Sequence, residues 1–180
     1  MGQFLRESDV FCLTETWAQK DDVFFLEGYV LISEPGEKKK EKGKGRVSGG
    51  ICVGWKNSLK VKEIRNKQKF VRWVGLERDQ RICMCIGAVY IPPASSEYYK
   101  EEFFDQLQEE LEAIEEEYPE ACRLLVGDMN ARIGEEDVTI AEDEEEELCW
   151  LVRQSKDKVV NKSGRKLLEI CQSEEMTILN

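Results

Sequence analysis

The sequence predicts a single domain of the α/β class. Its 180 residues suit one core, and a composition of 41% apolar and 35% charged residues allows that core a solvated surface. Short apolar runs of strand length fill the first half of the chain. An amphipathic helical pattern then follows a pair of prolines. The sequence therefore predicts a fold that is mostly β up to residue 90 and then acquires helices.

Runs rich in β-branched and aromatic residues mark the predicted strands. The end of a helix is expected at 3–7, before the first strand. The strands are expected at 9–14, 28–32, 49–55, 59–64, 70–76 and 82–90. The second and third flank a basic segment and are expected to pair as a hairpin. The last run is almost continuously apolar, which predicts a strand buried on both faces.

Helical periodicity begins after Pro92-Pro93. Ser95 or Ser96 can cap a helix whose apolar residues recur at three- and four-residue steps, and Pro119 ends it. The apolar run 123–126 predicts another buried strand. A last helix is expected at 164–172 and a last strand at 176–179.

Charge is segregated along the chain. The formal net charge is -11, and the run 142–147 consists only of acidic residues, whereas 38–46 is rich in Lys and Gly. We therefore expect a basic loop at 34–48 and an acidic loop at 134–148, both solvated. The basic loop has a second interpretation, as an arm that contacts phosphates.

The composition excludes several classes of function. The chain contains no histidine, which excludes a Ser-His-Asp triad, a Cys-His pair and a His-rich metal site. Its seven cysteines have no paired CxxC spacing and are expected to be reduced and buried. No segment approaches the roughly 20 apolar residues of a membrane span, and the N-terminus lacks a signal-peptide pattern. We expect an intracellular protein without a membrane partner.

Three predicted strand ends carry side chains suited to chemistry. Glu15 follows a strand in LTETW, Tyr90 ends one in VYIPP, and Asp128 and Asn130 follow one in LLVGDMN. Groups at strand ends are held rigidly and still reach solvent. Asp128 and Asn130 would point to the same side if the strand continued, and Gly127 permits close backbone approach. Taken singly, these signals are better explained by a surface glutamate, a packing tyrosine and a turn.

In this chain order, LTETW, YIPP and GDMN resemble the motifs of the endonuclease/exonuclease/phosphatase superfamily. The resemblance runs from about residue 9 to residue 180. The segments VYIPP, GDMNARIG and NKSGRKLLEICQSEEMTILN are most similar to the endonuclease domain of non-LTR retrotransposons. The resemblance implies a four-layer α/β sandwich, with two stacked mixed β-sheets flanked by helices, in one partial domain over residues 1–180.

The resemblance also implies a role for each strand-end residue. Glu15 would ligate Mg²⁺ or Mn²⁺, because hard carboxylate oxygens suit hard cations. Asp128 would orient and deprotonate the attacking water, Asn130 would hydrogen-bond the scissile phosphate, and Tyr90 would donate to a phosphate oxygen. The substrate would be DNA, in the nucleus for an enzyme of retrotransposon type. If so, these four side chains should converge.

The chain also departs from the superfamily pattern. A first strand with an asparagine, a later Asp and a final Asp-His pair have no counterpart here. We therefore expect a domain incomplete at both ends and impaired catalysis in this chain. Three alternatives stay open: a non-catalytic remnant of such a domain, a phosphatase of the same fold acting on a phosphorylated lipid or inositol, and an unrelated acidic interaction protein.

Overall fold

A computed structural model describes residues 2–38, 47–136 and 155–179 and divides the chain into two compact units. The first unit comprises Met1–Pro92 and Ile114–Asp128, and the second comprises Pro93–Ala113 and Met129–Asn180. Most of the predicted basic loop 34–48 and of the predicted acidic loop 134–148 lies outside the described residues.

Strands dominate the first unit. It contains α1 (Gly2–Glu7), β1 (Val10–Thr14), β2 (Tyr29–Glu34), β3 (Ile51–Lys56), β4 (Val61–Arg65), β5 (Val71–Arg78), β6 (Arg81–Tyr90) and β7 (Cys122–Asp128). Each predicted strand up to residue 90 is present with its ends shifted by a few residues at most. A two-residue turn joins β5 to β6, and both of its residues, Asp79 and Gln80, have positive φ, as a tight hairpin turn of this twist requires.

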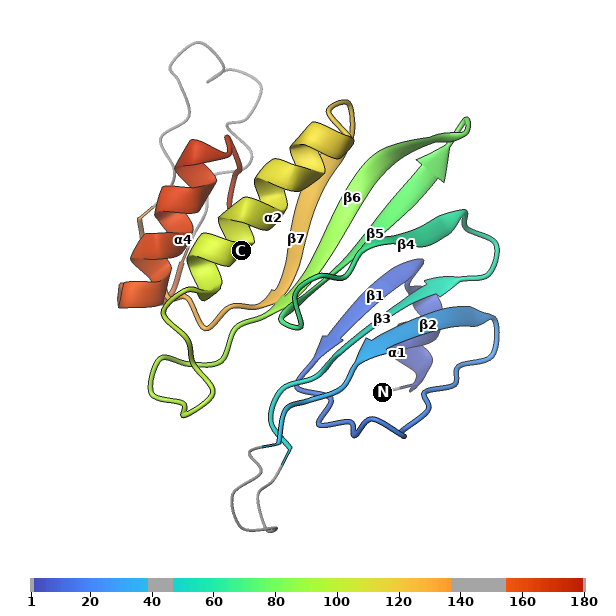
Figure 1. The fold of residues 1–180 in the computed structure, drawn as a ribbon, viewed down its shortest axis with the longest axis horizontal. Coiled ribbons are helices and arrows are strands. Elements are labelled where there is room, and N and C mark those ends of the chain that lie inside the picture. Colours follow the sequence, from blue (N-terminus) through green and yellow to red (C-terminus); the bar gives the residue numbers. More distant parts are fainter. Residues whose placement is uncertain (1, 39–46, 137–154, 180) are drawn as a thin grey trace. The chain divides into compact units, whose positions relative to one another are not determined.

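The strands form two sheets (Figure 1). The first has the order β1-β3-β2 and is antiparallel, so the predicted hairpin of the second and third strands is confirmed. The second has the order β4-β5-β6-β7 and is mixed, because β6 and β7 run parallel. Parallel neighbours need a crossover connection, and here it contains helix α2 (Phe103–Glu117).

The core of the first unit lies between the two sheets. Strands β1 and β3 pack over β5, β6 and β7. The buried side chains of the cluster come from both sheets: Ile51, Val53, Trp55, Val74, Ile86, Ala88 and Tyr90. From Cys85 onward every residue of β6 is buried, as its apolar run predicts. The predicted α/β class with two stacked sheets is confirmed, although the first sheet is antiparallel rather than mixed.

The predictions for the chain after residue 90 hold with two differences. Helix α2 begins at Phe103, well after Ser95 and Ser96, because residues 94–102 form turns instead of helix. Helix α4 (Lys162–Ser173) matches the last predicted helix. Residues 176–179 are not a strand, since no strand in the described part of the chain pairs with them.

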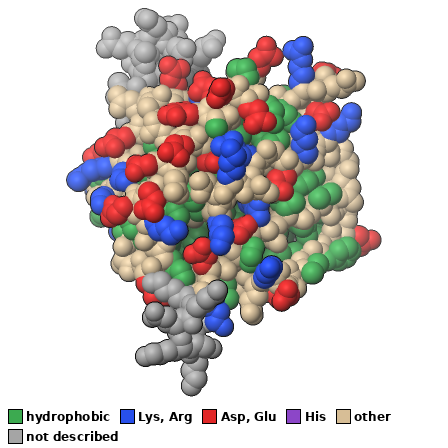
Figure 2. Space-filling model, viewed as in Figure 1, with side chains coloured by type: hydrophobic (Ala, Val, Ile, Leu, Met, Phe, Trp, Pro, Cys, Tyr) green, Lys and Arg blue, Asp and Glu red, His purple; other side chains and the backbone are tan. Residues whose placement is uncertain are grey.

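The surface mixes both signs of charge. On the face seen in Figure 2, Lys and Arg side chains are interspersed with Asp and Glu. None of the helices in the described residues is long and apolar enough to span a membrane.

A partly buried ion cluster joins the two sheets at one side. The guanidinium of Arg72 on β5 contacts the carboxylate of Glu34 on β2, and its Nη1 lies 2.8 Å from Oε1 of Glu63 on β4. The Arg72 side chain is only 12% exposed. Removal of the arginine would therefore leave two carboxylates poorly solvated and without their shared cation.

We expect Arg72→Met to lower the free energy of unfolding by about 3 kcal/mol, because the two glutamates lose their partner while partly buried. Urea denaturation measures the change. The same substitution at Arg78, an exposed position of the same strand, is the control and should leave stability unchanged within error. Equal effects of the two substitutions would contradict the role of the cluster.

Candidate active site

Glu15 lies immediately beyond β1, in a backbone held on both sides. The Thr16 N–H donates to the Gly50 carbonyl at 3.3 Å and the Trp17 N–H to the Gly49 carbonyl at 2.9 Å. Glu15 itself has a φ of 53°, in the left-handed region that glutamate rarely adopts. Such strain persists only where the surroundings enforce it, and it is frequent at functional sites.

Tyr90 connects the core to this glutamate. Tyr90 is 7% exposed and belongs to the buried cluster between the sheets. Its backbone N–H donates to the Phe70 carbonyl at 2.9 Å, which fixes the end of β6. The phenol hydroxyl donates to Oε1 of Glu15 at 2.9 Å. The structure thus brings two of the predicted site residues into direct contact across the two sheets.

Asp128 is the neighbour of Tyr90 on the adjacent strand. The two residues are register partners at the ends of the parallel strands β6 and β7, and the Ile91 N–H donates to the Asp128 carbonyl at 2.9 Å. Asp128 is exposed. A carboxylate that reaches solvent therefore stands beside the tyrosine, as the sequence motifs predict for strand ends.

The surroundings keep the Tyr90 phenol protonated. Burial raises its pKa most, and the hydrogen bond to Glu15 and the negative charges of Glu15 and Asp128 raise it further. A hydrogen bond with the Ser48 side chain acts in the opposite direction. The net pKa lies well above the ordinary value for tyrosine, so this hydroxyl is a hydrogen-bond donor at neutral pH.

Gly127 is required by close packing of β6 and β7. Its φ is 134°, and a Cβ atom there would lie 2.0 Å from the Val89 carbonyl oxygen. The close backbone approach expected at this glycine is therefore present, and it sets the position of the residue that follows, Asp128.

Asn130 belongs to the second unit. Strand β7 ends at Asp128, and Asn130 has a left-handed φ of 48°. Asp128 and Asn130 therefore do not lie on one continuing strand, and the alternation of a strand does not place them on the same side. The convergence of Asn130 with the other three residues stays a prediction.

Sequence reasoning missed the segment Ser48-Gly49-Gly50. Ser48 forms the hydrogen bond with Tyr90 noted above, and a Cβ at Gly49 would lie 3.0 Å from the Tyr90 ring. A Cβ at Gly50 would lie 2.4 Å from the Thr16 hydroxyl. The available signal was the adjacent glycine pair at the start of a strand, which often marks close approach of another segment.

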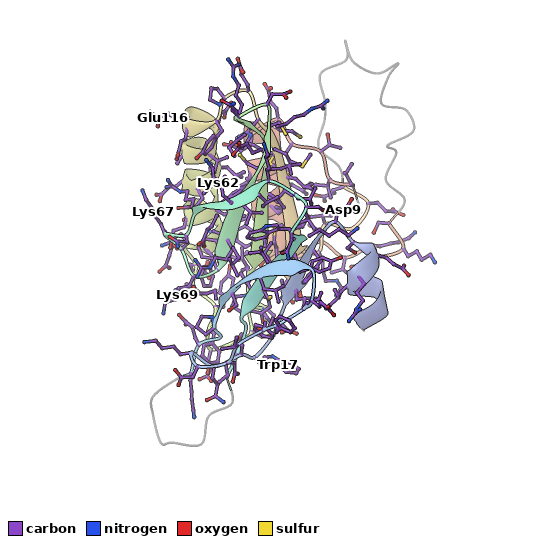
Figure 3. The ribbon with its side chains drawn as sticks, turned by 90° about the vertical axis from the view of Figure 1, so that its right-hand side faces the viewer. Asp9, Trp17, Lys62, Lys67, Lys69 and Glu116 are labelled. Carbon is purple, nitrogen blue, oxygen red and sulfur yellow. The ribbon has the colours of Figure 1, made fainter. Side chains whose placement is uncertain are left out.

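The loop after Glu15 exposes large apolar side chains. Trp17 is 48% exposed, Val23 91% and Phe25 87%. Figure 3 shows Trp17 at the outside of the structure. Exposed apolar side chains therefore follow Glu15 closely in the sequence.

The carboxylates at the site suit one kind of metal binding. In the described residues, no group of three or more Asp, Glu, Cys or His side chains could hold an ion. Glu15 is exposed, and its contact with Tyr90 involves Oε1. One carboxylate fits a Mg²⁺ ion that keeps several waters and binds substrate phosphate, and it does not fit a metal held by protein ligands alone.

We expect Gly127→Ala to destabilise the chain by more than about 3 kcal/mol, since the new Cβ meets the Val89 backbone and the φ is one that alanine avoids. Gly28→Ala is the matched control. Gly28 also has positive φ, but nothing lies within 4 Å of its Cβ position, so only about 1 kcal/mol is expected. Chemical denaturation compares them, and equal losses would show that the strand contact contributes nothing.

Tyr90 should make stability fall at high pH. Because its pKa is raised in the folded chain, its contribution is complete below the unfolded value of 10.0 and is lost as pH rises toward the folded value, since the unfolded phenol releases its proton first. The free energy of unfolding of the wild type should therefore decline more steeply above pH 10 than that of Tyr90→Phe. Urea titrations over this range test it, and parallel declines would refute the raised pKa.

Comparisons with known proteins show the fold. The sequence matches no protein-family model and no curated protein sequence. Its structure is similar to that of the human Nocturnin catalytic domain, solved with a bound sulfate anion, with a TM-score of 0.50 and 15% sequence identity. The match covers 72% of this chain and 54% of that one, so the chain spans about half the length of its structural neighbour. The likeness shows that the chain shares an α/β fold with that catalytic domain.

Proposed function

We propose that this chain is a Mg²⁺-dependent phosphodiesterase of the retrotransposon endonuclease type, which cleaves DNA slowly. The contact of the Tyr90 hydroxyl with Glu15, beside Asp128, carries the proposal. It places a protonated donor and two carboxylates at one end of the stacked sheets. This combination suits cleavage of a phosphate ester, which needs charge stabilisation and a proton acceptor.

Each side chain has one task. When Glu15 binds the metal, the single proton of the Tyr90 hydroxyl leaves its hydrogen bond with Glu15 and is donated to a phosphate oxygen, and the raised pKa keeps this proton on the phenol as negative charge develops. Asp128 is exposed and accepts the proton of the attacking water. Asn130 donates its amide to the scissile phosphate. Mg²⁺ or Mn²⁺ held at Glu15 would supply positive charge against the phosphate oxygens.

Two properties of the chain limit the rate that we expect. The chain has no histidine, so no imidazole is available to contact the scissile phosphate or to protonate the leaving oxygen. Its net charge of -11 opposes association with a polyanion. Binding should therefore be weak and should depend on the divalent cation.

The nicking of supercoiled plasmid DNA in Mg²⁺ or Mn²⁺ tests the proposal. We expect slow conversion to the open circle, which falls by about 100-fold in Glu15→Gln, because the metal loses its carboxylate ligand, and in Asp128→Asn, because the attacking water loses its proton acceptor. Glu27→Gln is the control, because it removes an exposed carboxylate from the same loop as Glu15 and should nick at the wild-type rate.

The outcomes distinguish this proposal from its alternatives. Nicking that is unchanged in Glu15→Gln would identify a contaminating nuclease and overturn the proposal. No metal-dependent nicking at all would favour a non-catalytic remnant. Release of phosphate from a phosphoinositide without plasmid nicking would favour a phosphatase of the same fold.

A further inference from the structure

Asn161 contacts the loop that contains Asn130. It is the N-cap of α4, with an extended backbone, and its Oδ1 accepts from the Gly164 N–H at 2.7 Å and from the Arg132 N–H at 3.1 Å. Its Nδ2 donates to the Asn130 carbonyl at 3.0 Å. Its backbone N–H donates to the Arg132 carbonyl at 2.9 Å. A single side chain therefore joins the start of a helix to two residues of the GDMNAR segment, all within the second unit.

The backbones at this junction are in close contact. A Cβ on Gly164 would lie 1.9 Å from the Arg132 carbonyl oxygen, so only glycine fits at this position of α4. The antiparallel bridge of Ile133 with Val160 continues the contact. The loop that follows β7 is thus attached to the start of α4 by backbone as well as by side-chain bonds.

The capping of α4 explains only half of the Asn161 side chain. An N-cap needs an acceptor oxygen for the N–H groups of the first turn, and Asp, Ser and Thr provide one as well as Asn does. The Nδ2 donor takes no part in capping. It binds the carbonyl of Asn130, a residue held in the left-handed conformation, which costs free energy for a side chain other than glycine.

We infer that Asn161 is a positioning residue: its Nδ2 donor holds the left-handed backbone of Asn130 and so fixes the position from which the Asn130 amide acts. The inference rests on the proposed function for the task of Asn130, while the attachment itself rests on the hydrogen bonds. Loss of the donor should leave α4 capped and release the Asn130 backbone.

Asn161→Asp separates the two tasks of the side chain. Aspartate keeps the acceptor for Gly164 and Arg132, and its charge is favourable at a helix N-terminus, so the melting temperature should fall less than in Asn161→Ala. Its second oxygen faces the Asn130 carbonyl without a proton to donate. The carbonyl-carbon chemical shift of Asn130, measured by NMR on the whole chain, should move, and kcat for DNA nicking should fall about tenfold with KM nearly unchanged.

Three further variants complete the test. Asn161→Ala should move the same chemical shift and also lower the melting temperature, because the cap is lost as well. Asn161→Ser keeps an acceptor, and replaces the Asp variant if that one does not fold. Lys162→Ala alters the neighbouring residue, which pairs with Glu101, and should leave the Asn130 shift and kcat unchanged.

The readouts separate failure of this inference from failure of the proposed function. An Asn161→Asp chain with the wild-type Asn130 shift and wild-type kcat would overturn the inference. A moved shift with a reduced kcat supports it fully. If the wild type does not nick DNA, the proposed function fails, and a moved Asn130 shift in Asn161→Asp still supports the attachment of Asn130 by Asn161.

Discussion

The packing of the two sheets in the first unit is the constraint on which its candidate site depends. The buried side chains between them belong to β3, β5 and β6, and partly buried apolar residues pack against them. Glu15 extends from the first sheet, whereas Tyr90 and Asp128 end strands of the second. Their meeting is therefore a consequence of sheet packing, and Arg72 adds a second connection between the sheets through Glu34.

Tyr90 links this packing to chemistry. Its ring is part of the core and its hydroxyl emerges beside a carboxylate, so the burial that stabilises the fold also raises the pKa of the phenol. A solvated tyrosine at the same strand end would be a weaker donor to a developing oxyanion, because water would screen it. Two glycines make this packing possible. Gly49 leaves room for the Tyr90 ring, and Gly127 lets β7 approach β6 closely.

In the second unit, the candidate residue Asn130 is held in a different way. Asn130 is held by hydrogen bonds from a helix cap rather than by sheet packing. Glu15 and Asn130 both have a left-handed backbone, and at each of them hydrogen bonds join the backbone to a distant segment of the chain. Strain at these residues is thus supported by contacts made far away in the sequence.

The sequence by itself determined the strands up to residue 90, the two helices after it, and the strand-end positions of Glu15, Tyr90 and Asp128, because periodicity, proline and glycine act locally. It also pointed to the fold type through the order of three short motifs. Only the tertiary structure decided that Tyr90 bonds to Glu15, that Ser48 and Gly49 border the phenol, and that Asn161 reaches back to Asn130. These contacts join residues 31 to 75 positions apart, and no local pattern encodes which distant backbone a side chain will meet. Contacts rather than residue type also explain the two differences after residue 90. Turn hydrogen bonds precede the late start of α2, and residues 176–179 have no partner strand in the described part of the chain.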